Sequence, residues 1–548
     1  MSRLLQHAIT DQALARPESV AVLSREAPLT YGELDAASNR LARLLRDIGC
    51  RRGDRIALLL PKMPAAIVSM MAVLKLDAAY VPLDSAGPAA RLARMLEISG
   101  CRCILAAGRT GPLLHEVLSC AGLARRPLLG WLDTSVQWDA EPAAEFTSSH
   151  LRSFSAAPIA AANSDRDLAH ILFTSGSTGV PKGVMITHHS VLQFLDWAWR
   201  YFGTSPADRT SQHAPLHFDL STFDIFGTLG AGAQLHLVPQ EVNLLPHKLA
   251  LFMRESRLTQ WFSVPSVLSL MAKFDCVRAG DFPDLRRVIW CGEAIPTPTL
   301  MYWMRRVPHA RFTNLYGPTE ATIASSYYTV PRCPSDEREA VPIGTACDGE
   351  ELLLLDERMR PVADGEIGDL YIAGAGLSPG YCNDPEKTRS AFLPRPGGVD
   401  PQDRIYRTGD RARRAVNGLY YFLGRVDSQI KSRGYRIELG EIEAALHTLR
   451  SVRECAVVAV ESAGFEGSMV CCAYVPAAGA GAHPAELRGS LTALLPAYML
   501  PVRWLSYSAL PRNANGKIDR PELCRRFSLT GLRPPEIMPV YARNLVHN

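Results

Sequence analysis

The sequence lacks the segments that would direct a chain to or through a membrane. Its N-terminal segment, MSRLLQHAITDQ, contains no long apolar run, so we expect no signal peptide. The most apolar segment, residues 65–74, is too short to span a bilayer. No basic block indicates nucleic acid as a partner, because 59 Lys and Arg are interspersed with 55 Asp and Glu. We therefore expect a cytoplasmic protein that binds neither a membrane nor nucleic acid.

The sequence also lacks the spacing of a zinc site or of a disulfide framework. No CxxC pair recurs with histidines, and the 13 cysteines form an odd, scattered set. In a chain without a signal peptide, such a set indicates reduced thiols.

The chain is too long for one ordinary hydrophobic core. With 548 residues, 47% hydrophobic and 21% charged, it suits a globular protein of two or more domains. An expected strand at residues 55–60, a helix at 65–76 and a strand near 79–82 alternate, which is typical of α/β layers. Residues 135–165, rich in Ala, Ser and Pro, predict a long surface connection.

A break near residue 425 divides the pattern. A hairpin-like segment ends there, and the following residues read as turn, strand and helix. We predict an α/β fold with a large N-terminal domain of mixed sheets and helices over residues 1–425. A small C-terminal α+β domain over residues 426–548 follows, within the ordinary size of a domain.

Small hydroxylated residues and glycines follow directly on an apolar strand in AHILFTSGSTGVPKGV, residues 169–184. Backbone N–H groups, hydroxyls and one lysine in such a loop suit the binding of phosphate, although a solvated linker is the alternative. The spacing of a Walker A loop, GxxxxGK[ST], is absent. The residues expected to contact phosphate are Thr174, Ser175, Gly176, Ser177, Thr178, Gly179 and Lys182.

This loop resembles the phosphate loop of the adenylate-forming superfamily, which includes acyl-CoA synthetases, luciferases and the adenylation domains of nonribosomal peptide synthetases. Further segments resemble motifs of this family in the same order, from about residue 10 to residue 525. They are LTYGELD, LDAAYVPLD, FDLSTFD, WCGEA, NLYGPTE, YRTGD, GRVD and PRNANGKID. One departure is Asp77, where the family usually has glycine.

The segment NLYGPTE carries the expected adenine and metal contacts. The resemblance implies that Tyr316 stacks on adenine and that Asn314 bonds the amino edge of the base. It also implies that Thr319 contacts phosphate and that Glu320 holds Mg²⁺, a hard cation that prefers carboxylate and phosphate oxygens. ATP and Mg²⁺ are therefore the expected cofactors.

Three further segments, WCGEA, YRTGD and GRVD, complete the expected nucleotide site. The resemblance places Gly292 and Glu293 beside the nucleotide. Asp410 corresponds to the carboxylate that accepts hydrogen bonds from both ribose hydroxyls, and Arg425 to an arginine that also meets the nucleotide.

Four residues of the C-terminal part carry expected roles in two reaction steps. The resemblance implies that Lys517 bridges the substrate carboxylate and ATP, where a cation offsets the repulsion between two anions. Asp427 corresponds to the hinge of a mobile domain. Lys431 and the loop through Gly434 match the segment that faces the carrier thiol in the family's second conformation.

Asp219 stands next to aromatic residues in FDLSTFD. Such a carboxylate could hold a desolvated ammonium group, or it could belong to the start of a surface helix, with Asp219 or Ser221 as a cap. In amino-acid-activating members of the family, the aspartate at this position binds the substrate α-amino group. Acyl- and aryl-acid activators usually lack it.

The expected substrate pocket is apolar apart from two polar clamps, Asp219 and Lys517. Phe223 and Phe262 are bulky and should shorten it, so we predict a small apolar substrate, alanine-like or proline. We interpret Cys291 as a wall residue, because no paired base is evident. The pocket residues are Asp219, Leu220, Phe223, Phe262, Ile289, Cys291, Leu315, Ile323 and Ala324.

The resemblance implies a ligase that forms aminoacyl-AMP and transfers the aminoacyl group to a phosphopantetheine thiol in natural-product biosynthesis. No condensation motif (HHxxxDG) and no carrier motif (GGxS) is found, so we expect a separate carrier protein. A small helper protein, which some relatives need, is a further candidate partner. An acyl-CoA or aryl-acid ligase is the first alternative, against which Asp219 argues. A non-catalytic sensor of amino acid or nucleotide is the second, against which Glu320, Asp410 and Lys517 argue.

Overall fold

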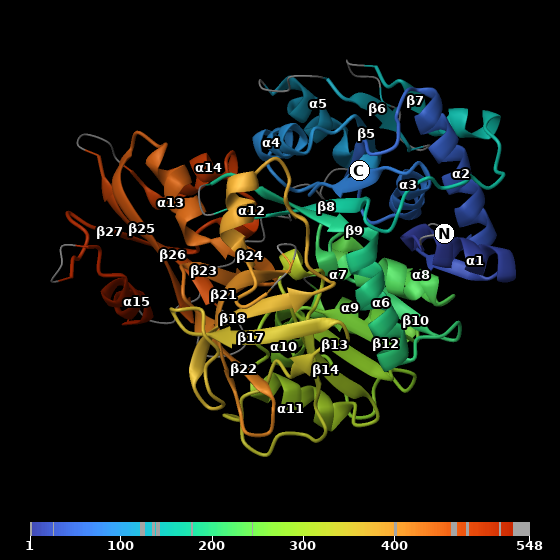
Figure 1. Ribbon diagram of the computed structural model, residues 1–548. Helices are drawn as coiled ribbons and strands as arrows, with labels where there is room; N and C mark the ends of the chain where they lie inside the picture. The colour runs from blue at the N-terminus through green and yellow to red at the C-terminus, as the bar shows by residue number, and fades with distance from the viewer. Residues whose placement is uncertain are drawn as a thin grey trace.

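The structure is a computed structural model with a large body and a smaller lobe (Figure 1). The body contains the blue, green and yellow segments, and the lobe contains the orange and red segments from β23 onwards. It describes residues 3–529 except residues 26, 121–125, 134–137, 139–142, 177–178, 244, 399, 401–402, 462–467, 478–481 and 514–516.

One sheet of the body carries the phosphate loop. Its strand order is β19-β9-β8-β4-β3-β5-β6-β7, parallel from β8 to β7 and antiparallel at β9 and β19. The strands are β3 (Arg55–Leu59), β4 (Ala79–Pro82), β5 (Cys103–Ala106), β6 (Leu128–Trp131), β7 (Phe146–Thr147), β8 (Leu168–Thr174), β9 (Lys182–Thr187) and β19 (Gly380–Tyr381). The predicted strands at 55–60 and 79–82 are present, whereas the predicted surface connection at 135–165 includes β7, which pairs with β6.

A second sheet carries the predicted substrate pocket. Its order is β16-β15-β14-β13-β12-β10-β11-β1-β2, and β10 to β14 are parallel neighbours. The strands are β1 (Val20–Leu23), β2 (Leu29–Thr30), β10 (Arg209–Gln212), β11 (Gln234–Leu237), β12 (Gln260–Ser263), β13 (Arg287–Cys291), β14 (Arg311–Tyr316), β15 (Ser326–Thr329) and β16 (Thr345–Ala346). Parallel strands end at a common edge, which is where α/β sheets bind ligands.

Helices cover the two sheets. In α2, the Thr30 side chain accepts a hydrogen bond from the Glu33 backbone N–H, and Leu34, Leu41 and Leu45 lie on its buried face. The α-helices of the body are α1 (Leu5–Ala15), α2 (Tyr31–Asp47), α3 (Pro64–Lys75), α4 (Ala89–Ser99), α5 (Gly111–Ser119), α6 (His188–Phe202), α7 (Asp219–Thr222), α8 (Thr228–Gly230), α9 (Pro246–Glu255), α10 (Pro265–Lys273), α11 (Thr297–Arg306) and α12 (Pro385–Ala391). A π-helical turn, η3 (Phe223–Gly227), joins α7 to α8. The 3-10 helices are η1 (Gly108–Thr110), η2 (Ser148–Ser153), η4 (Gln240–Val242), η5 (Thr319–Ala321) and, in the lobe, η6 (Ala497–Met499).

A third sheet holds the expected ribose contacts. Its strands are β17 (Glu350–Leu355), β18 (Ile367–Gly374), β20 (Phe392–Pro394), β21 (Arg404–Arg414) and β22 (Tyr420–Arg425). Antiparallel pairing of β21 with β22 sets Asp410 directly opposite Arg425. Their side chains therefore reach the same site.

The C-terminal lobe has its own two hydrophobic clusters, whose buried members lie between Ile437 and Phe527. Its elements are β23 (Gln429–Ser432), β24 (Tyr435–Glu438), α13 (Leu439–His447), β25 (Val452–Glu461), β26 (Ser468–Pro476), α14 (Pro484–Thr492), β27 (Arg503–Ser506) and α15 (Arg520–Leu529). The predicted fold, a large α/β domain followed by a small α+β domain, is confirmed. We propose residues 1–425 and 426–548 as the two domains, the latter including residues 530–548, which lie outside the described part.

The structure explains why an aspartate can occupy position 77, where the family usually has glycine. Its φ of 62° lies in the left-handed region, which glycine adopts without strain. The Asp77 carboxylate instead accepts hydrogen bonds from the backbone N–H groups of Ala162 at 2.8 Å and Asn163 at 3.2 Å. These bonds offset the strain and tie the connection that leads into β8 to the turn before β4.

All 13 cysteines are free. Among the described helices, we find none that is both long enough and apolar enough to cross a bilayer.

Candidate active site

A cavity lies where the two domains meet. Its wall combines the ends of β8 and β13, the start of α7 and the β23–β24 hairpin of the C-terminal domain. The wall includes these sequence-predicted residues: Thr174, Ser175, Asp219, Leu220, Cys291, Gly292, Thr319, Asp410, Arg425, Lys431 and Gly434.

The predicted phosphate loop connects β8 to β9. Thr174 ends β8 opposite Lys182, the first residue of β9. Gly176 is required, because a Cβ there would lie 2.0 Å from the Val180 carbonyl oxygen. Ser177 and Thr178 lie outside the described residues.

Lys182 and Gly179 are not among the residues that line the cavity. Gly179 has φ +81°. The Lys182 Nζ atom lies 5.4 Å from the centre of the Tyr381 ring. Burial lowers the pKa of Lys182, and the charge of Arg436 lowers it further. The strand start thus brings a cation close to the predicted phosphate position.

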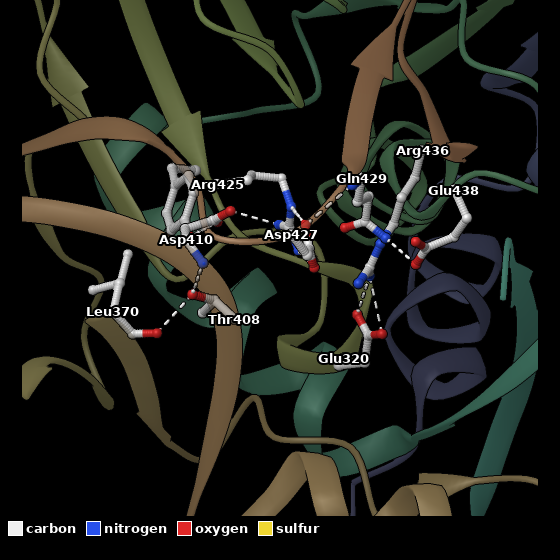
Figure 2. A network of polar contacts seen from close by, with 10 residues as sticks. Glu320, Leu370, Thr408, Asp410, Arg425, Asp427, Gln429, Arg436 and Glu438 are labelled. Carbon is white, nitrogen blue, oxygen red and sulfur yellow. Dashed lines mark hydrogen bonds and ion pairs between the residues drawn. The ribbon is translucent and has the colours of Figure 1, made fainter. Parts of the chain in front are cut away.

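Glu320 is fully buried and lies at one end of a polar network, where it contacts Arg436 (Figure 2). Its carboxylate accepts two hydrogen bonds from Arg436 Nη1, at 2.8 and 3.0 Å, and one from Tyr381 Oη at 2.8 Å. Burial alone would raise its pKa, but the charges of Arg436 and Lys182 and the Tyr381 bond lower that pKa to about 2. The carboxylate is therefore ionised, and in this arrangement Arg436 and Lys182 supply the opposite charge.

Asp410 joins the two edges of the expected ribose site. One carboxylate oxygen accepts from Arg425 Nη1 and the other from Tyr316 Oη, each at 2.5 Å. Arg425 also binds Asp427, the predicted hinge residue, through Nε at 2.8 Å and Nη2 at 2.9 Å (Figure 2). The ribose site and the predicted hinge are thus linked by one guanidinium.

Asn314 and Glu293 are held just outside the cavity. The Asn314 side chain donates from Nδ2 to the Pro342 carbonyl oxygen at 2.8 Å, which leaves its own oxygen as an acceptor. Glu293 accepts from the backbone N–H of Ser266 at 3.1 Å and of Gly434 at 2.7 Å. Glu293 therefore anchors the hairpin of the C-terminal domain to the N-terminal domain.

Asp219 faces the cavity and does not cap a helix. It is the first residue of α7, whose N-cap is Phe218, and the Ser221 hydroxyl donates to the Phe218 carbonyl oxygen at 2.6 Å. Thr319 Oγ1 donates to Asp219 Oδ2 at 2.8 Å. Burial raises the pKa of Asp219, while the Thr319 bond and the Lys431 charge oppose that rise. A cation placed beside this carboxylate would relieve the cost of its burial.

The apolar part of the predicted pocket is closed by packing. Phe223 and Phe262 meet edge to face, with ring centres 5.4 Å apart. Cys291, on the wall itself, is 1% exposed, and burial raises the pKa of its thiol to about 12, so the thiol stays protonated. The other apolar members are at most 5% exposed and belong to one hydrophobic core: Leu220, Phe223, Phe262, Ile289, Leu315, Ile323 and Ala324.

Two family models match the chain. One, described as "AMP-binding enzyme", covers residues 9–382, and the other, "AMP-binding enzyme C-terminal domain", covers residues 441–517. The chain belongs to the AMP-binding enzyme family. The predicted resemblance is therefore confirmed.

Curated relatives match over nearly the whole chain. Surfactin synthase subunit 2 of Bacillus subtilis is 37% identical over 514 residues, which is 94% of this chain and 13% of that protein. Phosphinothricin tripeptide synthetase PhsC of Streptomyces viridochromogenes is 37% identical over 557 residues, which is 99% of this chain and 47% of that protein. The chain thus spans less than half the length of either relative.

Solved structures give the same result. The Vibrio cholerae adenylation domain AlmE, solved with glycyl-adenosine-5'-phosphate, has a TM-score of 0.81 at 27% identity, covering 96% of this chain and 97% of that chain. Holo-PA1221, which contains adenylation and PCP domains, has a TM-score of 0.77 at 26% identity, covering 96% and 84%. This AMP-binding enzyme is an adenylate-forming ligase and uses ATP.

The AMP-binding enzyme holds its small domain in one defined arrangement. Lys431 and Gly434 line the cavity, whereas Lys517 is exposed and is not part of the wall. The Lys517 backbone N–H donates to Asn513 Oδ1 at 3.1 Å in a surface turn. The structure thus brings together the residues predicted for the transfer step and leaves out the lysine predicted for adenylation.

Sequence reasoning did not assign several residues of the cavity. Arg436 lies in the segment SRGYRIELGEIE, whose pattern gave it no role, and only its contact with Glu320 reveals one. Arg91 of α4 forms a buried ion pair with Glu441 of α13. Tyr498 stacks on Tyr435 with ring centres 3.7 Å apart. No local sequence signal could have found these contacts, because each joins segments far apart in the chain.

Proposed function

We propose that this enzyme activates a small apolar amino acid, alanine-like or proline, as aminoacyl-AMP. It then transfers the aminoacyl group to the phosphopantetheine thiol of a carrier protein. The observation that carries the proposal is the half-buried carboxylate of Asp219, held by Thr319 on the cavity wall beside a closed apolar pocket.

The amine end of the pocket supports an amino acid rather than a simple acid. A buried carboxylate is costly unless it meets an opposite charge. Lys431 lies close enough to oppose the rise in the pKa of Asp219. The α-ammonium group of an amino acid supplies the charge directly. A fatty or aryl acid has no ammonium group and would leave the Asp219 carboxylate without that charge.

The closed end of the pocket supports a small side chain. Phe223 and Phe262 pack edge to face and belong to the same hydrophobic core as Cys291. AlmE was solved with a glycyl adenylate, and this related structure supports a substrate of small size. Apolar walls discriminate by about 10–200-fold per methylene, so near relatives of the preferred amino acid should react slowly.

In the first step, the substrate carboxylate attacks the α-phosphorus of ATP, and the bond to pyrophosphate breaks. Asp219 orients the amino acid, and Asp410 and Arg425 hold the ribose. Glu320 is the residue that would hold Mg²⁺, which supplies positive charge to the phosphate oxygens. Lys517 must enter the cavity for this step, so the small domain has to turn about Asp427.

In the second step, the carrier thiol replaces AMP on the aminoacyl carbon. The arrangement in the structure suits this step, because the β23–β24 hairpin lines the cavity and Lys517 is outside it. Holo-PA1221 contains a PCP domain beside its adenylation domain, which supports a carrier protein as the partner. A free-standing carrier and a small helper protein remain parts of the proposal.

The test is amino-acid-dependent ATP–pyrophosphate exchange across the proteinogenic amino acids. We expect strong exchange with alanine or proline, reduced by at least about 100-fold in Asp219→Ala. Asp196→Ala, a surface aspartate of α6 paired with Arg3, is the matched control. Exchange only with a large or charged amino acid would overturn the pocket argument.

Two other functions give different results in the same assay. Turnover of a simple carboxylic acid with release of a free acyl-CoA would show an acyl-CoA or aryl-acid ligase. Binding of ATP without any pyrophosphate release would show a sensor. Asp219 argues against the first function, and the ionised Glu320 with its cation partners argues against the second.

A further inference from the structure

Two polar side chains on the cavity wall have no part in the steps described above. Asp84 follows β4, and His217 precedes the first residue of α7 by two positions. His217 Nε2 lies 3.9 Å from Asp84 Oδ2, and the two side chains are 19% and 23% exposed. The other oxygen of Asp84 accepts from the Ala86 backbone N–H at 2.9 Å, which fixes the carboxylate.

His217 stands on the path between the amine clamp and the C-terminal domain. It is two residues from Asp219 and also lines the cavity. A row of rings continues across the domain boundary: the His217 and Phe218 centres are 5.1 Å apart, and those of Phe218 and Tyr435 5.0 Å apart. If Asp219 holds the substrate amine, the reactive carbonyl is two bonds from that amine, in the cavity that His217 also lines.

Three other titratable groups on the wall are accounted for. Asp219 accepts from Thr319, and Asp410 accepts from Arg425 and Tyr316. The Cys291 thiol is protonated, since its pKa is raised to about 12. Among the wall residues that the structure describes, His217 is the one imidazole.

We propose that His217, oriented by Asp84, is the general base that accepts the proton of the carrier thiol. The inference rests on the proposed transfer of an aminoacyl group. A thiol with an ordinary pKa of about 8.5 is mostly protonated at pH 7, and the thiolate is the nucleophile. A base on the path of the thiol therefore accelerates the transfer.

The step balances as follows. The S–H bond breaks and its proton passes to an imidazole nitrogen of His217, while sulfur attacks the carbonyl carbon of the aminoacyl-AMP. A C–S bond forms, the C–O bond to the phosphate breaks, and AMP leaves with the electron pair. The imidazolium, stabilised by the Asp84 carboxylate, then returns its proton to solvent.

The charges around His217 suit a base at neutral pH. Burial lowers the pKa of His217, the Asp84 carboxylate opposes that change, and the Lys62 ammonium adds to it. The charged wall residues on other elements include Arg91 of α4, which pairs with Glu441 of α13, and Lys431 and Arg436 of the β23–β24 hairpin. The imidazole is therefore neutral at pH 7 and ready to accept a proton.

The experiment separates the two half-reactions in the full chain. Pyrophosphate exchange reports adenylation, with the amino acid that exchanges fastest. Transfer is measured in a single turnover, by adding pantetheine to the preformed aminoacyl-AMP complex between pH 5.5 and 9.5. The variants are His217→Gln, Asp84→Asn and His217→Ala with added imidazole. His189→Gln, whose Nδ1 lies 3.1 Å from Asp165 on the surface, is the matched control.

We expect transfer at pH 7 to fall about 100-fold in His217→Gln and about 10-fold in Asp84→Asn, while exchange falls at most about threefold. The deficit should shrink above the pKa of the thiol, where thiolate no longer needs a base. Added imidazole should restore part of the transfer in His217→Ala, which a packing role would not allow. His189→Gln should behave as the unaltered enzyme.

Three results would overturn the inference. The first is an equal fall of exchange and transfer in His217→Gln, together with no rescue by imidazole, which would assign His217 a packing role. The second is transfer that does not change in either His217→Gln or Asp84→Asn. The third is an unaltered enzyme that exchanges with no amino acid, in which case the proposed function itself fails before the thiol is added.

Discussion

Lys431 and Lys517 belong to the same small domain, yet they differ completely in surroundings. Lys431 lines the cavity near Asp219 and Cys291, while Lys517 lies exposed in a turn beside Asn513. Two cations that the proposed reaction needs at one site are thus presented by two different faces of one domain. A rigid small domain cannot offer both faces at once, so the two steps require two arrangements.

The two faces also differ in how they are fixed. The hairpin with Lys431 is anchored by Gly434 on Glu293, by Arg436 on Glu320 and by Ser175, whose hydroxyl donates to the Arg436 carbonyl oxygen at 2.6 Å. In the other face, the Lys517 backbone N–H is bonded to Asn513 within the same turn. The hairpin face is thus held against the N-terminal domain by three contacts, an arrangement that suits the proposed transfer step.

Replacing Lys517 should give the largest difference between the two half-reactions. In Lys517→Ala we expect pyrophosphate exchange to fall by about 100–1,000-fold, because a cation that stabilises the transition state is lost. Transfer from a preformed aminoacyl-AMP to pantetheine should change less than about threefold, since Lys517 lies outside the cavity during that step. Lys248→Ala, an exposed lysine on α9, is the control. An equal loss in both half-reactions would contradict the separation.

Gly434→Ala should have the opposite effect and reduce transfer more than exchange. Gly434 has φ +81°, and a Cβ there would lie 2.6 Å from Val264 Cγ1, so the hairpin cannot close as it does in the structure. We expect transfer to pantetheine to fall by about 10–100-fold, with a smaller effect on exchange. Gly418→Ala has the same kind of φ, +80°, but no neighbour within 4 Å of the new methyl group, and is the matched control. Adding Val264→Ala should recover part of the lost transfer.

A smaller effect is expected from Arg436→Gln. The change removes one cation from the buried Glu320, but Lys182 and Tyr381 remain beside the carboxylate. Hairpin closure should weaken, and transfer should fall about 10-fold. Hydrogen exchange of the backbone amides in residues 429–438 should rise in the same variant. Arg433→Gln, an exposed residue of the same hairpin, should leave both measurements unchanged.

The pH dependence of hairpin closure should be the smallest effect. The pKa of Glu320 is lowered from 4.5 to about 2 in this arrangement, so its ion pair with Arg436 is fully present above about pH 4.5. The stabilisation is lost only as the pH falls towards 2. Amide protection of residues 429–438, corrected for intrinsic exchange, should therefore vary less than about twofold between pH 8 and 5. A midpoint near pH 6 would instead assign closure to a histidine.

Local sequence determined the elements and the chemistry of the site. The helix predicted at 65–76 is α3, which begins with Pro64 because proline suits a first helical position. The glycines of the phosphate loop and the carboxylates Asp219 and Asp410 were identified from their motifs, and the structure places both aspartates on one cavity wall. These features depend on residues close together in the chain, whose geometry the sequence encodes directly.

Only the tertiary structure decided which face of the small domain meets the cavity. The Arg436–Glu320 and Arg91–Glu441 contacts cross the domain boundary and join segments more than a hundred residues apart. The same helices and strands of the small domain would form in either arrangement, because local propensities do not depend on the neighbour across a domain boundary. The choice between Lys431 and Lys517 therefore rests on packing and charge pairing between domains, which no stretch of sequence carries alone.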